Sequence, residues 1–392
     1  MNYYDIKASQ VEGRLLRRWV ERNRYVTGSG NEQVIVAVDQ QRIYFQTSST
    51  NRQHVIIREK LRKAIALLLH RKTVLRKELE RFSHMNSSLM GLLRHLFIET
   101  AKFVRTKMGQ LRLTIKGCRF FFSGLERASR KELECLRIAG AKHILASYFY
   151  LRGSLSTPPL LRFIEGNECD LLLDSGEFSS YKARMKYGDD VSVITVEEYA
   201  EFIRTYDHLI YAFFNLDVTG DPVLSAANFD KLRSLTGRNP IPVWHPNLDD
   251  WRNSDFSELE RLVNEDHAVI AIGGTVHLGL KVGPLMSNKV KAALFHEIYS
   301  RFGDSQNFHW LGGSSRFMHR FPFFSADSSG YLQARKFQQR YYFDGEDIAT
   351  RQDQELSAWE LLLENVRLFS NLERDTNPML YGEEETGEFV VL

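Results

Sequence analysis

The chain has 392 residues, which is too long for one small domain and long enough for a parallel α/β barrel of about 250 residues plus one further module. Hydrophobic residues make up 43% and charged residues 26%, close to the globular average, which excludes wholesale disorder and a fibrous architecture. The net charge of +3 conceals a segregation: residues 1–116 carry 23 Lys and Arg against nine Asp and Glu, net +14, and the remainder is at −11. A basic part joined to an acidic part predicts that the first binds a polyanion, most commonly nucleic acid, while the second performs chemistry. The alternative is that the excess charge only solvates helical faces.

The first module, residues 1–116, is expected to be mostly helical. A short helix is predicted over residues 10–23, and two apolar alternating runs within residues 34–47 predict a β-hairpin. Helical periodicity then predicts two long amphipathic helices, over residues 54–82 and 87–107. Six basic side chains of the first lie largely off its apolar stripe and are predicted to meet phosphate: Arg58, Arg62, Arg71, Lys72, Arg76 and Lys77.

From residue 117 onward the sequence consists of short apolar runs separated by helical segments. This pattern is typical of a parallel sheet with helices outside it. Eight strands are predicted, over residues 119–123, 143–149, 170–174, 209–216, 241–244, 268–272, 308–311 and 322–326. Helices between and after them are predicted over residues 130–139, 195–206, 255–264, 287–302 and 355–372. The fold class is therefore α/β, with a (β/α)₈ TIM barrel over residues 117–372. Residues 373–392 are expected to form an acidic, poorly ordered tail.

Acidic residues follow several of the predicted strands. Asp174 follows the third strand, Asp217 the fourth and Asp327 the eighth. Because catalytic groups of such barrels lie where strands end, these carboxylates are predicted to converge on one mouth. Three carboxylates can divide the roles of nucleophile, general acid/base and substrate recognition. The alternative for each one is a helix N-cap.

Several short segments together resemble a known family. The segment LLLDSGEFSS, residues 171–180, resembles the DSGGF-type motif of the tRNA-guanine transglycosylase superfamily, and NLDV, PVWH, AIGG and FFSADSS follow in the expected order. The resemblance extends from Phe120 to about Lys336. It is closer to divergent phage and bacterial members, which include DNA-modifying 7-deazaguanine transglycosylases, than to the housekeeping tRNA enzyme.

The resemblance implies a role for each matching residue. Asp327 would be the nucleophile that attacks C1′ of the sugar, and Asp174 the general acid/base. A carboxylate nucleophile would trap an oxocarbenium-like sugar as a covalent intermediate, as in retaining glycosidases. Asp217 would read the Watson–Crick edge of a guanine-like base. The base-binding set implied in this way is Asp217, Phe178, Ser175, His245, Gly273 and Gly274.

Three departures from the family pattern concern metal and base binding. The zinc motif of the tRNA enzymes is absent, because Cys118, Cys135 and Cys169 are scattered, so no cofactor is expected and a structural zinc would need other ligands. His245 stands where the family has glutamine, which changes the purine contacts. Glu177 stands where the family has glycine; we expect it to point to solvent, the alternative being an effect on substrate choice.

Histidines and basic residues near the last two strands are the remaining candidates. His277, His296, His309 and His319 form no HxH or HExxH pattern, so they are expected to be packed or solvated and no metal site is predicted. Four basic residues flank the eighth strand and are predicted to hold backbone phosphates, the alternative being ordinary surface charge: Arg316, Arg320, Arg335 and Lys336.

These patterns predict a transglycosylase that exchanges a guanine in nucleic acid for a 7-deazaguanine derivative. DNA is the preferred substrate, tRNA is the first rival, and a nucleoside or glycoside hydrolase and a non-catalytic nucleic-acid-binding barrel are rivals from other classes. A base within a duplex would have to be flipped into the barrel mouth. For the basic module, a second subunit or a protein partner stays open. The N-terminus lacks an apolar signal region and no run approaches the roughly 18 apolar residues of a membrane span, so a cytoplasmic location without membrane contact is expected.

Overall fold

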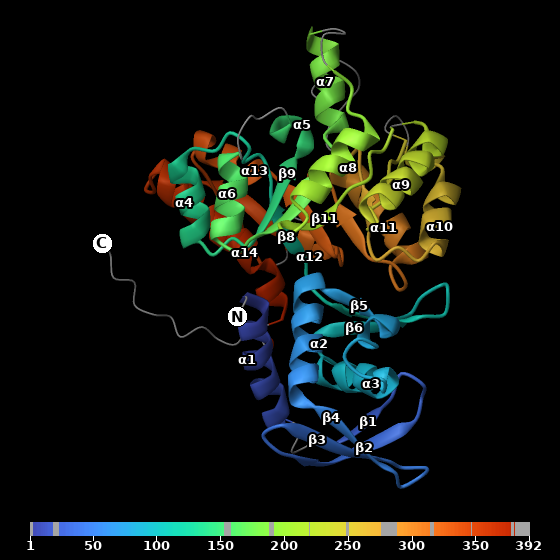
Figure 1. The fold of residues 1–392 in the computed structure, drawn as a ribbon. Coiled ribbons are helices and arrows are strands. Elements are labelled where there is room, and N and C mark those ends of the chain that lie inside the picture. The colour runs from blue at the N-terminus through green and yellow to red at the C-terminus, as the bar shows by residue number, and fades with distance from the viewer. Residues whose placement is uncertain are drawn as a thin grey trace. The chain divides into compact units, whose positions relative to one another are not determined.

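The chain separates into two compact units in the computed structural model (Figure 1). The structure describes residues 3–18, 23–152, 158–187, 192–218, 220–247, 251–275, 288–313, 317–345, 347–377 and 380. One unit comprises residues 1–116 with 374–392, and the other residues 117–373. Each has its own core of buried apolar side chains. Within the described ranges, none of the helices has the length and apolarity needed to cross a membrane.

The first unit combines helices with two antiparallel sheets. Its helices are α1 (Tyr3–Arg18), α2 (Arg58–Arg71), the 3-10 helix η1 (Arg76–Leu79) and α3 (Asn86–Leu96). A four-stranded sheet has the order β1 (Arg24–Val26), β2 (Glu32–Val38), β3 (Arg42–Thr47), β4 (Gln53–Ile57). A three-stranded sheet has the order β5 (Thr73–Leu75), β7 (Leu111–Ile115), β6 (Ala101–Arg105). The predicted hairpin is confirmed, because β2 and β3 pair antiparallel.

The prediction of a mostly helical first unit is wrong, because both long helices that the periodicity indicated are only half helical. In the first, residues 53–57 pair with β3, and α2 ends at Arg71, where Lys72 takes a φ of +62°. In the second, α3 ends at Leu96 and residues 101–105 pair with β7. Pairing with strands distant in sequence therefore prevails over the local helical period.

The second unit is built on eight parallel strands. Their order in the sheet is β11 (Ile210–Phe213), β10 (Asp170–Asp174), β9 (His143–Ser147), β8 (Arg119–Phe122), β15 (Ser325–Ser328), β14 (Phe308–Trp310), β13 (Ile270–Ile272), β12 (Val243–Trp244). All eight predicted strands are confirmed as members of it. The ladder is open between β11 and β12, where the connection is a single parallel bridge between Phe214 and Ile241. At this bridge the Ile241 N–H donates to Phe213 O (2.8 Å), and the Asn215 N–H donates to Ile241 O (2.9 Å). The strand order and the bridge are consistent with a TIM-like fold.

Helices connect the strands and follow them. They are α4 (Arg130–Ile138), α5 (Tyr148–Leu151), α6 (Pro159–Gly166), α7 (Glu177–Tyr187), α8 (Val196–Thr205), α9 (Pro222–Thr236), α10 (Phe256–Asn264), α11 (Asn288–Phe302), α12 (Phe317–Arg320), α13 (Gly330–Ala334) and α14 (Ala358–Thr376). Two 3-10 helices, η3 (Trp251–Asn253) and η4 (Arg335–Phe337), and a hairpin of β16 (Gln339–Phe343) and β17 (Ile348–Gln352) complete the unit. The five predicted helices of this unit are confirmed as α4, α8, α10, α11 and α14. In Figure 1, α7 projects away from the sheet.

Side chains alternate between the two faces of the sheet. Phe120 and Phe122 belong to the core that the strands share with the surrounding helices. Phe121, between them, belongs to a separate cluster with Leu145, Leu172, Phe214 and Ala271. An apolar cluster on each face is what a curved sheet with helices outside and a packed interior requires.

An ion pair with little solvent exposure joins the first strand of the second unit to its last helix. The Nε of Arg119, in β8, donates to Oε2 of Glu373 in α14 at 2.8 Å, and a terminal nitrogen donates to Oε1 at 3.1 Å. The side chains are 2% and 10% exposed. The bidentate geometry offsets the desolvation of both charges, and the pair holds α14 against the sheet. Either charge would destabilise the fold if it were buried without the other.

Replacing Glu373 by Ala should therefore destabilise the protein. The substitution takes the bidentate carboxylate away from the buried Arg119 charge, and the expected loss in free energy of unfolding is about 3–5 kcal/mol. Urea unfolding followed by circular dichroism measures it. The matched control is Glu355→Ala, because Glu355 is exposed and should change stability by less than about 0.5 kcal/mol. Equal unfolding midpoints for the two variants would contradict this role of the pair.

Candidate active site

Three aspartates predicted to form a site lie at the carboxyl ends of parallel strands. Asp174 is the last residue of β10, Asp327 lies in β15, and Asp217 follows β11. The charges of Asp217 and Asp327 both raise the pKa of Asp174, so the three carboxylates are close enough to interact. The structure therefore brings together groups that the sequence separates by up to about 150 residues.

Asp174 holds a proton far more tightly than an ordinary aspartate. Burial, followed by the charges of Asp217 and Asp327, raises its pKa to about 7. Its Oδ2 accepts a hydrogen bond from the N–H of Gly176 at 3.1 Å. Gly176 has a φ of +83°, and a Cβ there would lie 2.5 Å from the Cβ of Phe149, so this turn of the DSG segment requires glycine. A carboxyl group with a pKa of about 7 can both donate and accept a proton at neutral pH.

Asp327 is held by one of its two carboxylate oxygens. Its Oδ1 accepts from the N–H of Gly312 at 2.9 Å and lies 3.4 Å from Nε2 of His309. Its Oδ2 makes no hydrogen bond to any residue that the structure describes. The side chain is 9% exposed. An oriented carboxylate with one oxygen uncommitted is suited to nucleophilic attack.

Asp217 forms a short contact with His245. Nε2 of His245 lies 2.6 Å from Oδ2 of Asp217, and the two side chains are 25% and 15% exposed. A Cβ at Gly273 would lie 2.6 Å from Cε1 of His245, so only glycine lets the imidazole occupy this position. His245 is therefore held against Asp217, and the pair offers hydrogen-bonding groups that a ligand can reach.

Glu126 is a further carboxylate of the cluster that the sequence pattern did not single out. It lies in the loop after β8, and its Oε1 accepts from the N–H of Ser147 at 2.8 Å. Burial raises its pKa, and the charge of Asp327 raises it further. Its place after the first strand is the signal that would have found it, because catalytic groups of parallel α/β barrels follow the strands.

Other predicted members of the site are placed differently from expectation or lie outside the description. Glu177 does not point to solvent: its Oε1 accepts from Arg184 at 2.6 Å, its side chain is 23% exposed, and burial raises its pKa. Glu177 is turned toward Arg184 of the same helix, which is why the expectation was wrong. Ser175 is buried, whereas Gly274 is partly exposed. The side chain of Phe178 lies outside what the structure describes.

The basic residues predicted to bind phosphate fall into three groups. Lys72 is 1% exposed, so its predicted contact with nucleic acid is wrong: it lies where α2 ends and β5 begins. Arg58 pairs with the buried Glu12 at 2.9 Å, and Arg62 approaches the same carboxylate at 3.9 Å, so both hold α2 against α1. Arg71, Arg76 and Lys77 are exposed, although Arg71 also pairs with Glu78.

In the second unit two of the four predicted phosphate contacts have protein partners. Arg335 pairs with Glu132, and Arg320 pairs with Asp347 at 2.7 Å. Lys336 is exposed, and Arg316 lies outside the described residues.

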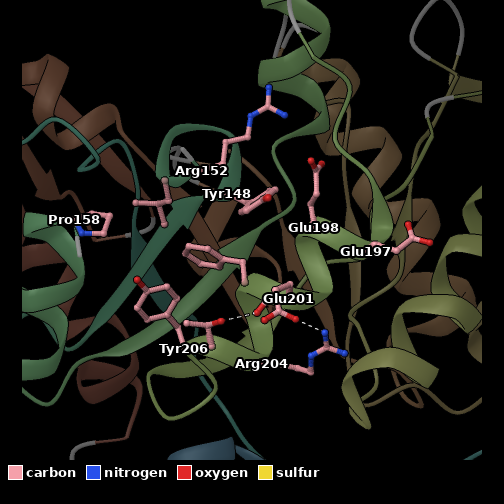
Figure 2. A pocket seen from close by; sticks show the side chains of 11 residues that line it. Tyr148, Arg152, Pro158, Glu197, Glu198, Glu201, Arg204 and Tyr206 are labelled. Atoms are coloured by element: carbon pink, nitrogen blue, oxygen red, sulfur yellow. Dashed lines mark hydrogen bonds and ion pairs between the residues drawn. The ribbon is translucent and has the colours of Figure 1, made fainter. Parts of the chain in front are cut away.

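A groove of about 630 Å³ lies on the outer side of the sheet, between α5 and α8 (Figure 2). The rings of Tyr148 and Phe202, 5.2 Å apart, form part of its wall, and the ion pair of Glu201 with Arg204 lies at its edge. None of the four interacting carboxylates lines it. We assign the candidate active site to the carboxylates and not to this groove, because converging groups with raised pKa values mark chemistry.

Metal ligands are not assembled in the described part of the chain. No group of three or more His, Cys, Asp or Glu residues there is arranged to hold a metal ion. The three cysteines are buried and free. His296 and His319 pack against the rings of Phe321 and Phe343, and His277 lies outside the description.

No protein-family model matches this chain, and no curated protein matches it.

Replacing Asp174 by Asn should change stability in a way that depends on pH. Because its pKa is raised from 3.8 to about 7, the folded chain binds this proton more tightly than the unfolded chain, and ionisation costs stability as the pH rises through that interval. Asparagine cannot ionise, so the variant should be more stable than the wild type at pH 8, by about 1.4 kcal/mol for each unit of the shift. The difference should vanish toward pH 4.

Thermal unfolding of both proteins at several pH values between 4 and 8 measures this effect. Asp304→Asn, at an exposed position, is the matched control and should give a difference that does not depend on pH. A pH-independent difference for Asp174→Asn as well would show that the carboxyl is not buried among like charges.

Proposed function

We propose that the second unit is a base-exchanging transglycosylase that acts on nucleic acid, with its active site at the carboxyl end of a (β/α)₈ barrel. The observation that carries the proposal is that two carboxylates with different properties share one site. Asp327 is oriented through Oδ1, and its Oδ2 has no hydrogen bond to a described residue. Asp174 has a pKa raised to about 7. The order of the segments that resemble the tRNA-guanine transglycosylase superfamily supports the same chemistry.

The exchange divides into two displacements at the sugar. In the first, Oδ2 of Asp327 bonds to C1′, the bond from C1′ to N9 of the guanine breaks, and protonated Asp174 gives its proton to the departing base. In the second, ionised Asp174 takes the N9 proton of the incoming 7-deazaguanine base. That nitrogen bonds to C1′, and the electron pair of the ester returns to Asp327. A pKa of about 7 lets one residue serve both steps.

Recognition of the base falls to Asp217 and its neighbours. A carboxylate can accept from the N1–H and the 2-amino group of a guanine-like base. Because His245 occupies Oδ2 of Asp217, the other oxygen is left for the base. Gly273 and Gly274 would offer backbone groups to the base, and Ser175 and Phe178 complete the proposed pocket.

The polymer is proposed to be DNA, on the strength of the resemblance to the divergent branch, with tRNA as the alternative. Extracting a base from a duplex costs a few kcal/mol, which contacts to the backbone must offset. Arg71, Arg76 and Lys77 are exposed in the first unit and suit that task, as does Lys336 in the second.

The direct test offers the protein a labelled 7-deazaguanine base together with duplex DNA or tRNA. Label should enter one polymer while guanine is released in equal amount. Asp327→Ala should abolish exchange while polymer affinity stays nearly unchanged, because backbone contacts dominate binding. Asp304→Ala, which removes an exposed carboxylate, is the control. Release of guanine without incorporation would indicate a hydrolase, and no reaction with either polymer would overturn the proposal.

Substitution of Arg76 and Lys77 by Ala should lower the affinity for nucleic acid, and the affinity should depend less steeply on salt concentration. If each side chain neutralises one phosphate, the slope of log affinity against log salt should become less steep by about 2 for duplex DNA, at about 0.9 per contact. The control removes the same charge from α9, by Lys231→Ala with Arg233→Ala. Equal slopes for both double variants would show that the first unit binds something else, such as a protein partner or a second subunit.

A further inference from the structure

A histidine lies in the apolar interior of the second unit, directly beside the proposed nucleophile. His309, in β14, has a side chain that is only 1% exposed. The rings of Phe121 and Phe214 flank it, at centroid distances of 6.3 and 5.1 Å. A polar ring in such a layer is costly unless its nitrogens have partners, so its hydrogen bonds need an explanation.

Both ring nitrogens of His309 are directed at residues of the neighbouring strand. Nδ1 lies 2.8 Å from Oγ of Ser325, and Nε2 lies 3.4 Å from Oδ1 of Asp327. Ser325 and Asp327 are two residues apart in β15 and so face the same side, and His309 is paired in register with Ser325. The three side chains therefore form a continuous row that ends at the carboxylate.

The partners of His309 determine where its proton lies. An ionised carboxylate only accepts hydrogen bonds, so the contact with Asp327 needs a hydrogen on Nε2. In a neutral imidazole Nδ1 is then the acceptor, and the hydroxyl of Ser325 has to donate to it. Asp327 thus selects the tautomer, and Ser325, whose hydroxyl can donate as well as accept, completes it.

We propose that His309 is a positioning residue for Asp327, an inference that rests on the proposed role of Asp327 as nucleophile. Together with the N–H of Gly312, its Nε2–H fixes Oδ1 and leaves Oδ2 as the only oxygen that bonds to the sugar. When that ester breaks, the electron pair returns to the carboxylate, and the same two donors stabilise the charge. The ring is too deeply buried to act on the substrate directly.

The first test observes the tautomer and needs no activity. In the full-length protein with ¹⁵N-labelled imidazoles, nuclear magnetic resonance distinguishes the two neutral tautomers, and loss of a signal in His309→Gln assigns it. Wild type should carry the proton on Nε2. Asp327→Ala removes the acceptor that holds the proton on Nε2, so it should shift the population toward Nδ1–H, where Ser325 can accept. Ser325→Ala leaves that carboxylate in place, so it should keep the proton on Nε2. A wild-type proton on Nδ1, or no shift in Asp327→Ala, would overturn the proposed arrangement.

The second test separates positioning from packing. His309→Phe keeps an aromatic ring but loses the donor, and should lower kcat for base exchange about 10²–10³-fold with KM unchanged. His309→Gln restores an N–H at similar reach and should recover kcat to within about tenfold of wild type. Thermal unfolding verifies that both variants fold. Equal losses in the two variants, or a change confined to KM, would contradict the positioning role.

The two tests distinguish failure of this inference from failure of the proposed function. If the wild type exchanges no base but shows the tautomer and its shifts, the transglycosylase proposal fails while the row from Ser325 to Asp327 stands. If the wild type exchanges bases and the tautomer does not respond, the function stands and His309 is only a packed residue.

Discussion

The parallel direction of eight strands is the constraint on which the rest of the second unit depends. It places every carboxyl end at the same edge of the sheet, so that Asp174, Asp217 and Asp327 approach one another despite their separation in sequence. Like charges held close together cannot all stay ionised without cost. Burial together with this repulsion raises the pKa of Asp174 to about 7, which makes the group suitable for proton transfer at neutral pH.

The apolar interior beneath the carboxylates contributes to the same effect. Phe121, Leu145 and Leu172 fill the layer inside the sheet and keep water out from below. Burial is the largest cause of the raised pKa of Asp174 and also of Glu126. His309 interrupts this layer, and its nitrogens are directed at Ser325 and Asp327. The interior thus acts both as a packed core and as the support of the candidate site.

The first unit shows how far net charge overstates the charge that is free to bind a polyanion. Of the six cations that helical periodicity assigned to one face, Lys72 is buried, and Arg58 and Arg62 are drawn to the buried Glu12. A carboxylate that is taken out of water needs cationic partners, and α2 supplies them. The cations left for nucleic acid are those with exposed side chains, such as Arg76 and Lys77.

Local sequence patterns determined the eight strands, five helices of the second unit and the aspartates at the strand ends, because alternation and helical periodicity depend on near neighbours. They also indicated Gly273, although not that a Cβ there would meet His245. Only the tertiary structure decided that residues 53–57 and 101–105 are strands, since their partners lie elsewhere in the chain. It alone placed Glu126 and His309 beside Asp327. Residues on neighbouring strands come together through the pairing of the strands, which the spacing of residues within one segment does not predict.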